Sequence, residues 1–446
     1  MSNHPPLGFT FAGVPCGLKK TGTADFALIA SDRLCAAAAV FTRNKFAAAP
    51  VIYDRALVTE HPAGLRAVAI NSGCANACTG DAGLADAATM AAEVEVVLGL
   101  PARSCAVMST GVIGVRLDMS KIAAGVRLAA PQLAAEGWDA ASRAIMTTDT
   151  RPKVAFRELA PPGREAGGVR LFGMAKGAGM IHPNMATMLS TIITDAAIEP
   201  AALVALLRGA VEVSFNSVSV DGDTSTNDTV LVLANGASGV TVSGGEGEWE
   251  NGRMGERENA SALPLSHSPT LSYVDFAAAL TSLCIDLAQQ IARDGEGATK
   301  FITVRVEGAA SDADARSAAK AVANSPLVKT AFYGGDANWG RILAAVGYSG
   351  AEVDPARADL WIAAGSGGAG EEEKGRRLPL SHSPTPALQL VSAGQPLDYS
   401  EAAASAIFAE KEIVVEVKLG LGDGQATVWT CDLSHEYVDI NGHYRT

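Results

Sequence analysis

Apolar residues recur at every third or fourth position in several stretches of the chain, a spacing that is typical of amphipathic helices. The most regular stretch spans residues 272–292 and carries Phe276, Leu280, Leu283, Leu287 and Ile291. The same periodicity, with capping residues or Pro at several starts, predicts helices at residues 81–99, 120–129, 140–146, 200–213 and 311–323. Helices are therefore expected along most of the chain.

Short apolar runs bounded by Gly and Pro alternate with these helices and predict strands. The runs lie at residues 37–41, 49–53, 67–70, 104–108, 169–174, 189–193 and 301–306. Near the C-terminus, residues 412–419 and 425–432 flank a glycine-rich turn and predict a β-hairpin. The alternation of strands and helices predicts a layered α/β (α+β) architecture.

Length and composition describe a large globular protein. The 446 residues suffice for two or three domains, and 48% hydrophobic with only 5% aromatic residues predicts a core of Ala, Val, Leu and Ile. A net charge of −13 argues against a nucleic-acid partner. No apolar run reaches the roughly 18 residues of a membrane helix, and residues 1–9 lack the features of a signal peptide. We therefore expect a cytoplasmic protein without a membrane partner.

No motif predicts a metal or a cofactor. The seven cysteines are expected to be free thiols, because the zinc alternative at Cys74 and Cys78 lacks a second pair of ligands. Asp221, Asp223 and Asp228 could suggest calcium, but their loop does not match the EF-hand pattern, so we interpret them as hydrogen-bonding structure. A P-loop and a dinucleotide fingerprint are also missing from the sequence.

The segment Lys176–Leu189 reads Lys-Gly-Ala-Gly-Met-Ile-His-Pro-Asn-Met-Ala-Thr-Met-Leu. Small Ala186 precedes Thr187, so the Thr187 hydroxyl can reach the preceding carbonyl without a bulky neighbour. Cleavage there would make Thr187 an N-terminus, whose own amine can activate its hydroxyl as a nucleophile. By spacing alone, an ordinary glycine-rich loop with a buried threonine is the favoured interpretation, and self-cleavage is the alternative.

This segment resembles the signature of the ornithine acetyltransferase (glutamate N-acetyltransferase) family, in which Lys-Gly-Ala-Gly-Met is followed by a self-cleaving Ala-Thr-Met-Leu. The resemblance implies cleavage between Ala186 and Thr187, with Thr187 as the nucleophile. It implies an α chain of residues 1–186, and a β chain that completes the catalytic core with residues 187–300 and adds a smaller C-terminal α/β domain, residues 301–446. It further implies the DmpA/ArgJ-like fold of stacked helix and sheet layers, and an α2β2 heterotetramer.

Other motifs of this family recur along the chain. Thr110 and Gly111, at a strand end reading Ser-Thr-Gly, resemble its oxyanion-hole pair. Met146-Thr-Thr-Asp-Thr150 resembles a substrate-contacting cluster, in which we favour Thr148 and keep Thr147 as the alternative. The resemblance implies substrate contacts by Thr148, Lys176, Thr187, Glu296, Asn441 and Thr446.

Two segments that resemble family motifs also allow a prediction of their local structure. Glu296 lies between two glycines, which predicts a carboxylate on an exposed turn. Residues 329–342, another family block, are punctuated by glycines and predict a loop that shapes the pocket.

The resemblance implies a ping-pong reaction that moves an acetyl group from N-acetylornithine to glutamate through an acetyl-threonine, without a cofactor. Acetyl-CoA is a possible second acetyl donor, which the sequence does not decide. Two alternatives of other classes stay open: a self-cleaving aminopeptidase of the related superfamily, and an uncleaved binding protein.

Residues 244–270 and 365–385 depart from the family pattern. Both are rich in Gly and charged residues and end in the same octapeptide, Leu-Pro-Leu-Ser-His-Ser-Pro-Thr. We interpret them as inserted surface loops with His267 and His382 solvated, while a shared partner-binding tag is the alternative.

Overall fold

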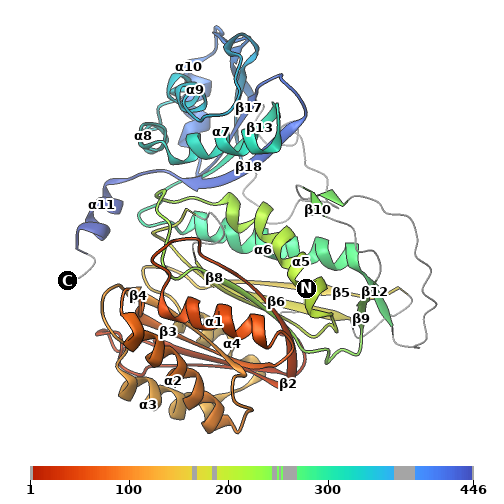
Figure 1. Cartoon of the computed structure of the whole chain (residues 1–446). Helices are drawn as coiled ribbons and strands as arrows, with labels where there is room; N and C mark the ends of the chain where they lie inside the picture. The colour runs from red at the N-terminus through yellow and green to blue at the C-terminus, as the bar shows by residue number, and fades with distance from the viewer. Residues whose placement is uncertain are drawn as a thin grey trace. The chain divides into compact units, whose positions relative to one another are not determined.

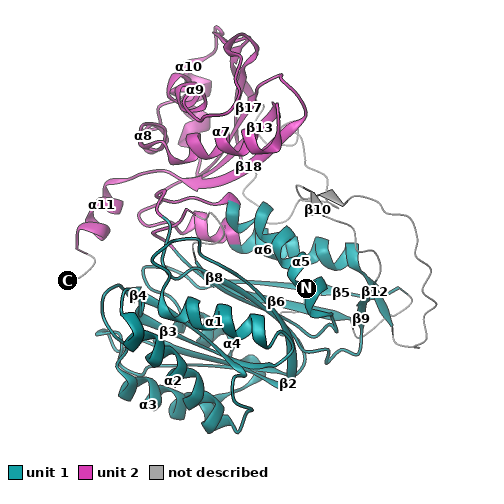
Figure 2. Cartoon of the chain, in the orientation of Figure 1, with its two compact units in different colours: residues 1–177, 183–216, 224–287 teal, residues 178–182, 217–223, 288–446 magenta. Residues whose placement is uncertain are grey.

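The computed structural model describes residues 4–162, 168–182, 188–243, 249–250, 253–254, 269–365 and 387–443. The chain forms two compact units, which Figure 2 shows in different colours. Unit 1 comprises residues 1–177, 183–216 and 224–287, and unit 2 comprises residues 178–182, 217–223 and 288–446. Each unit combines helices with a sheet (Figure 1), which confirms the predicted α/β class.

The sheet of unit 1 has eight strands in the order β4-β3-β2-β8-β7-β6-β5, with β1 paired to β2. Its strands are β1 (Phe9–Val14), β2 (Phe26–Phe41), β3 (Leu65–Cys74), β4 (Cys105–Val112), β5 (Lys153–Leu159), β6 (Val169–Lys176), β7 (Leu189–Thr194) and β8 (Thr229–Ala234). The long strand β2 joins two halves of this sheet, because its first part pairs with β3 and residues 36–41 pair with β8.

Alternation along the strands places side chains in two different cores. Ala27 and Ile29 of β2 belong to a core with α1 (Ala49–Glu60), α4 (Trp138–Ala144) and residues of β6 to β8. Phe26 and Leu28 belong to a second core with α2 (Gly80–Leu98) and α3 (Met119–Ala129). This period of two is the reason that neighbouring residues of one strand serve opposite faces. The resulting helix and sheet layers are visible in Figure 1.

Two more helices follow in the chain, α5 (Pro200–Val213) and α6 (Tyr273–Arg293). Gly173 of β6 leaves room for α6, because a Cβ there would lie 2.7 Å from Leu283 and 2.8 Å from Leu287. Among the described helices, α6 alone is long and apolar enough to cross a membrane. Its regularly spaced apolar side chains are buried inside the protein, which is the behaviour of a core helix.

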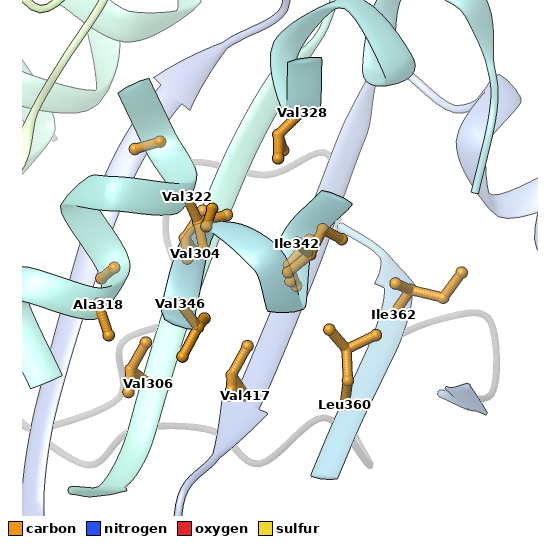
Figure 3. Packing of buried hydrophobic residues seen from close by; sticks show 14 of the residues in the cluster. Val304, Val306, Ala318, Val322, Val328, Ile342, Val346, Leu360, Ile362 and Val417 are labelled. Atoms are coloured by element: carbon orange, nitrogen blue, oxygen red, sulfur yellow. The ribbon is translucent and has the colours of Figure 1, made fainter. Parts of the chain in front are cut away.

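Unit 2 contains a six-stranded sheet in the order β16-β15-β14-β17-β13-β18. Its strands are β13 (Phe301–Ala309), β14 (Asp359–Ala364), β15 (Leu388–Ser392), β16 (Gln395–Pro396), β17 (Glu412–Lys418) and β18 (Gly424–Cys431). Its helices are α7 (Asp312–Asn324), α8 (Pro326–Gly334), α9 (Trp339–Gly347), α10 (Glu401–Ala409) and α11 (His435–Gly442). Figure 3 shows its core of aliphatic side chains, in which Val304, Val322 and Ile342 pack together.

Two small sheets complete the described strands. β9 (Thr241–Ser243) pairs with β12 (Thr270–Ser272), and β10 (Trp249–Glu250) pairs with β11 (Arg253–Met254). Almost all of the two predicted insertions, with His267 and His382, lies outside the described residues.

The predicted C-terminal hairpin is wrong. Its two strands exist as β17 and β18, but β13 lies between them, parallel to β17 and antiparallel to β18. A glycine-rich turn reports only that two strands are close along the chain. Here β13, more than 100 residues earlier in the sequence, forms the ladders with both strands.

Two other local predictions are also wrong. Residues 49–53 begin helix α1, because Pro50 stands in its first turn, where a missing N–H has no cost. The glycine-punctuated stretch 329–342 is mostly helical: Gly335, with φ of 70°, ends α8, and the Asn338 side chain caps α9. The turn-forming residues therefore mark the break between two helices instead of one long loop.

Candidate active site

Thr110 and Gly111, the predicted oxyanion pair, lie at the end of β4, an edge strand of the unit 1 sheet. Thr110 and Gly111 pair with Ser72 and Gly73 of β3. Lys176, the last residue of β6, comes to the same place, and its Nζ lies 3.3 Å from Oγ1 of Thr110. The structure thus brings Thr110 and Lys176 together although 66 residues separate them in the sequence.

Gly111 occupies a position that only glycine fits. Its φ is +129°, and a Cβ would lie 2.3 Å from the carbonyl carbon of Gly73 and 2.6 Å from the nitrogen of Cys74. Both neighbours are backbone atoms, so they cannot turn away as a flexible side chain could. The close approach of β3 and β4 at this point therefore depends on the missing side chain.

We expect Gly111→Ala to lower the free energy of unfolding by about 1–3 kcal/mol, because the methyl group would force the two strands apart. Gly114→Ala is the matched control, since Gly114 also has a positive φ, 84°, but nothing lies within 4 Å of its Cβ position. Urea denaturation measures the free energy of unfolding of both variants. The strain of a positive φ is common to both, so the difference between them reports the clash of the added methyl group with β3. Equal losses in the two variants would contradict the role given to the contact with Gly73.

A buried ion pair lies beside this cluster and was not identified from the sequence. Asp149 accepts a hydrogen bond of 2.6 Å from Nζ of Lys153, and both side chains are fully buried. The Asp149 carboxylate also accepts the N–H of Gly177 at 2.7 Å and the N–H of Thr147 at 2.9 Å. One carboxylate therefore ties the threonine turn to the residue that follows Lys176.

Asp149 remains ionised despite its burial. Burial by itself raises the pKa of this carboxyl, but the charges of Lys153 and Lys176 and the bonds from Lys153 and Gly177 outweigh it and hold the pKa well below its usual range. Only a weak sequence signal existed for the pair: a lysine at the start of an apolar strand, four residues after an aspartate. Thr147 and Thr148 are both half-buried, so the choice between them as a substrate contact stays a prediction.

In unit 2, Glu296 and Asn441 are hydrogen-bonded partners. Nδ2 of Asn441, on α11, donates to Oε2 of Glu296 at 2.7 Å. The N–H of Glu296 donates to the carbonyl of Ala178 at 2.8 Å, and a Cβ at Gly179 would lie 2.2 Å from Oε2 of Glu296. The second glycine of the Lys-Gly-Ala-Gly motif therefore makes room for the Glu296 carboxylate.

The prediction of an exposed Glu296 is wrong, since only 6% of this residue is exposed. The turn around it is covered by α11, where a Cβ at Gly297 would lie 2.6 Å from the nitrogen of Tyr437. A sequence motif of small and polar residues indicates a turn but does not show what packs on it. Burying a carboxylate costs free energy unless its charge is compensated, so the buried Glu296 side chain is suited to bind a cation.

The interpretation of the aspartate-rich loop as hydrogen-bonding structure is confirmed for Asp221. Its carboxylate accepts the N–H groups of Met180 at 2.5 Å, Ile181 at 2.8 Å and Asp223 at 3.2 Å. These bonds hold Met180 at a φ of +56°, a conformation that non-glycine residues rarely adopt. Ala186, Thr187 and Thr446 lie outside the described residues, so their predicted roles stay predictions.

Comparison with known proteins gives a consistent result. A model of the ArgJ family matches residues 10–446. The arginine biosynthesis bifunctional protein ArgJ of Symbiobacterium thermophilum is 48% identical over 99% of this chain and 98% of its own length. The mitochondrial protein of that name from Neurospora crassa is 46% identical, over 99% of this chain and 89% of its own.

A solved structure of ornithine acetyltransferase from Mycobacterium tuberculosis in complex with ornithine is 39% identical, with a TM-score of 0.35. The match covers 41% of this chain and 94% of that chain. The family model spans nearly the whole sequence, and the two relatives are 46–48% identical along almost all of it. The chain therefore belongs to the ArgJ family, as its motifs predicted.

Proposed function

We propose that this protein is a self-cleaving acetyltransferase of arginine biosynthesis, which moves the acetyl group of N-acetylornithine to glutamate through an acetyl-threonine. The observation that carries the proposal is the match of the ArgJ family model to residues 10–446, which includes the Ala186–Thr187 bond. The contact of Lys176 with Thr110 supports the proposal, because it brings an ammonium group and a hydroxyl group together at the end of β4.

In the first half of the reaction, Oγ of Thr187 attacks the acetyl carbonyl of N-acetylornithine. The freed α-amine of Thr187 takes the hydroxyl proton and passes it to the departing amine of ornithine. The Thr110 hydroxyl and the backbone at Gly111 stabilise the oxyanion that forms on the carbonyl oxygen. The C–N bond of the substrate breaks, a C–O bond to Thr187 forms, and ornithine leaves.

In the second half, the amine of glutamate attacks the acetyl ester. The Thr187 α-amine takes a proton from the attacking amine and returns it to Oγ as the ester bond breaks. The products are N-acetylglutamate and the regenerated Thr187 hydroxyl. Splitting one acyl transfer into two steps on a single nucleophile requires neither a metal nor a bound cofactor.

Charge complementarity supports this pair of substrates. Both amino acids carry a carboxylate, which the Lys176 ammonium can attract as a point charge. The side chain of ornithine ends in a cation, which the buried Glu296 carboxylate can bind, with Asn441 holding the carboxylate in place. Thr148 and Thr446 complete the proposed contacts with substrate.

The test is an intact-mass measurement of the denatured protein, with and without N-acetylornithine. We expect two fragments, residues 1–186 and 187–446, and one acetyl mass added to the second fragment, which glutamate then removes. Fragments that never acetylate would favour the aminopeptidase alternative, and hydrolysis of short peptides would then be measured. A single chain that never acetylates would favour the binding protein and overturn the proposal.

The acetyl donor, the assembly and the location need separate measurements. We propose an α2β2 heterotetramer of the cleaved chains, which native mass spectrometry tests directly. Acetyl-CoA is the proposed second donor, and acetylation of the second fragment by acetyl-CoA alone would support it. A cytoplasmic location stays a prediction that cell fractionation tests, since the Neurospora relative is a protein named as mitochondrial.

We expect Glu296→Gln to raise the KM for N-acetylornithine by about 10- to 100-fold, because a hydrogen bond to a charged group contributes roughly 1.5–3 kcal/mol. The deacetylation step with glutamate should change much less, since glutamate has no cationic side chain. Glu410→Gln, at an exposed position of unit 2, is the control and should leave both steps unchanged. Equal losses in the two steps would contradict the pairing of Glu296 with ornithine.

A further inference from the structure

The connection between β1 and β2, residues 15–25, carries two lysines that the reaction described above does not use. Lys20 is exposed, whereas Lys19 is half-buried. Moving an ammonium group out of water costs free energy unless a partner compensates its charge. The partners of the Lys19 ammonium group therefore decide what this lysine can do.

Asp25, which is fully buried, holds this connection in place. Its carboxylate accepts the N–H of Cys16 at 2.6 Å and the N–H of Lys19 at 2.8 Å. Its backbone carbonyl accepts the N–H of Ser72, on β3, at 2.9 Å. One residue thus fixes the backbone of Lys19 and ties the connection to β3.

The Lys19 side chain packs on β3 beside the predicted oxyanion pair. A Cβ at Gly73 would lie 3.4 Å from Cγ of Lys19. In the ladder of β3 and β4, Gly73 is a partner of Gly111. Gly111 follows Thr110, whose Oγ1 lies 3.3 Å from Nζ of Lys176. Lys19 therefore lies at the same end of β3 and β4 as the contact of Thr110 with Lys176.

The ammonium group of Lys19 has hydrogen-bonding capacity to spare. Its Nζ donates one bond, to the carbonyl of Ala24 at 2.9 Å. An ammonium group has three N–H donors, and the other two have no acceptor among the residues that the structure describes. They can bind the oxygens of a carboxylate while the bond to Ala24 is kept.

The surrounding charges favour an anion at this end of the sheet. Burial lowers the pKa of Lys19, the charges of Asp25 and Asp149 act in the opposite direction, and the charge of Lys176 lowers it further. Asp149 is already hydrogen-bonded to Lys153 at 2.6 Å. Lys19 and Lys176 therefore repel each other, and both attract a carboxylate that binds near them.

The two substrates of the proposed reaction differ in their number of carboxylates. N-acetylornithine has one, and glutamate has a second one on its side chain. Lys176 is the proposed partner of the carboxylate that both share. Glu296 cannot bind the second carboxylate, because like charges repel. The side chain of glutamate therefore requires another cation.

We propose that Lys19 is a specificity-determining residue of the acetyl transfer, whose ammonium group binds the side-chain carboxylate of glutamate in the second half of the reaction. This inference rests on the proposed function and deepens it, because it names the group that selects a dicarboxylate as the acetyl acceptor.

The test uses Lys19→Met, which removes the charge but keeps an unbranched side chain that can pack on Gly73. The protein is acetylated with N-acetylornithine and freed of substrate, and the loss of the acetyl mass after addition of glutamate is followed by intact-mass measurement. We expect the KM for glutamate to rise about 10- to 100-fold, the effect of losing a hydrogen bond to a charged group. Acetylation by N-acetylornithine should keep the native rate.

Glutamine as the acceptor separates recognition of charge from a structural effect. It has nearly the shape of glutamate but no charge on its side chain. The native protein should prefer glutamate to glutamine, and Lys19→Met should lose most of this preference. Lys19→Arg, which keeps the positive charge, should retain part of it. A purely structural role would slow both acceptors equally.

Lys20→Met is the matched control. Lys20 is the next residue of the same connection, is exposed, and loses the same charge in the substitution. This variant should keep the native rates of both half-reactions and the native preference for glutamate. It thereby separates the role of Lys19 from a general effect of net charge on the binding of anions.

Two results would overturn the inference and leave the proposed function intact. One is an equal loss in both half-reactions of Lys19→Met, and the other is a preference for glutamate over glutamine that Lys19→Met retains in full. A native protein that never takes up the acetyl group would overturn the proposed function, and this inference with it.

Discussion

Asp149→Asn should lower the free energy of unfolding by about 3–5 kcal/mol, because it leaves the Lys153 ammonium buried without its counter-ion. Lys153 and Asp149 are fully buried at 2.6 Å, so water cannot solvate the charge that remains. The amide also weakens the bonds to Gly177 and Thr147. Urea denaturation of the native and substituted proteins measures the loss.

Asp139→Asn provides the matched control for this ion pair. Asp139 and Arg143 have the same spacing of four residues and a distance of 2.9 Å, but both side chains are more than half exposed. An exposed pair contributes only about 0–1 kcal/mol, so this variant should unfold almost as the native protein does. A loss of less than 1 kcal/mol in Asp149→Asn would contradict the role given to the buried pair.

The pH dependence of stability follows from the same carboxylate. The pKa of Asp149 is lowered in the folded protein, so its contribution is fully present above the unfolded value of about 4. It is lost as pH falls from there toward the folded value. The native protein should therefore lose more stability below about pH 4 than Asp149→Asn does, which acid titration followed by circular dichroism can measure.

Thr110→Val should lower the rate of acetyl transfer by about 10²- to 10³-fold, the effect of removing one oxyanion-hole donor. Valine has nearly the same shape as threonine, so β4 and its pairing with β3 should be retained. The substitution also removes the oxygen that lies 3.3 Å from Nζ of Lys176. Single-turnover acetylation by N-acetylornithine, read by intact mass, measures the chemical step.

Thr89→Val is the control, because Thr89 is exposed on α2 and its hydroxyl donates only to the carbonyl of Ala85. It should acetylate at the native rate. Thermal unfolding of Thr110→Val should match the native curve within a few degrees. A slow Thr110→Val that has also lost its stability would indicate a packing role for the residue instead of an oxyanion role.

Local patterns predicted most of the helices and many of the strands of this protein. The helix predicted at residues 200–213 is α5 with the same bounds, and the amphipathic stretch 272–292 is α6 within one residue at each end. Helical hydrogen bonds join residues four positions apart, so the information that forms them lies in one short segment. The motif around Lys176 predicted the family for a similar reason, since its chemistry is concentrated in consecutive residues.

The wrong predictions concern contacts between segments that lie far apart in the sequence. β17 and β18 are correct as strands, yet their pairing with β13 involves segments more than 100 residues apart. The burial of Glu296 comes from α11, more than 130 residues later in the chain. A strand's pattern shows which face is apolar, but it does not show which other strand takes its hydrogen bonds.

The sequence by itself therefore determined the family and the α/β class, and it predicts Thr187 as the nucleophile on which the proposal depends. Only the tertiary structure decided that Lys176 lies beside Thr110 and that Lys153 neutralises a buried Asp149. The physical reason is that the packing of distant segments decides whether a charge is buried, even where its partner is only four residues away, as for Asp149 and Lys153. The chemical type of each residue is known from the sequence, whereas the packing of the whole unit sets the protonation state and the contacts of its side chain.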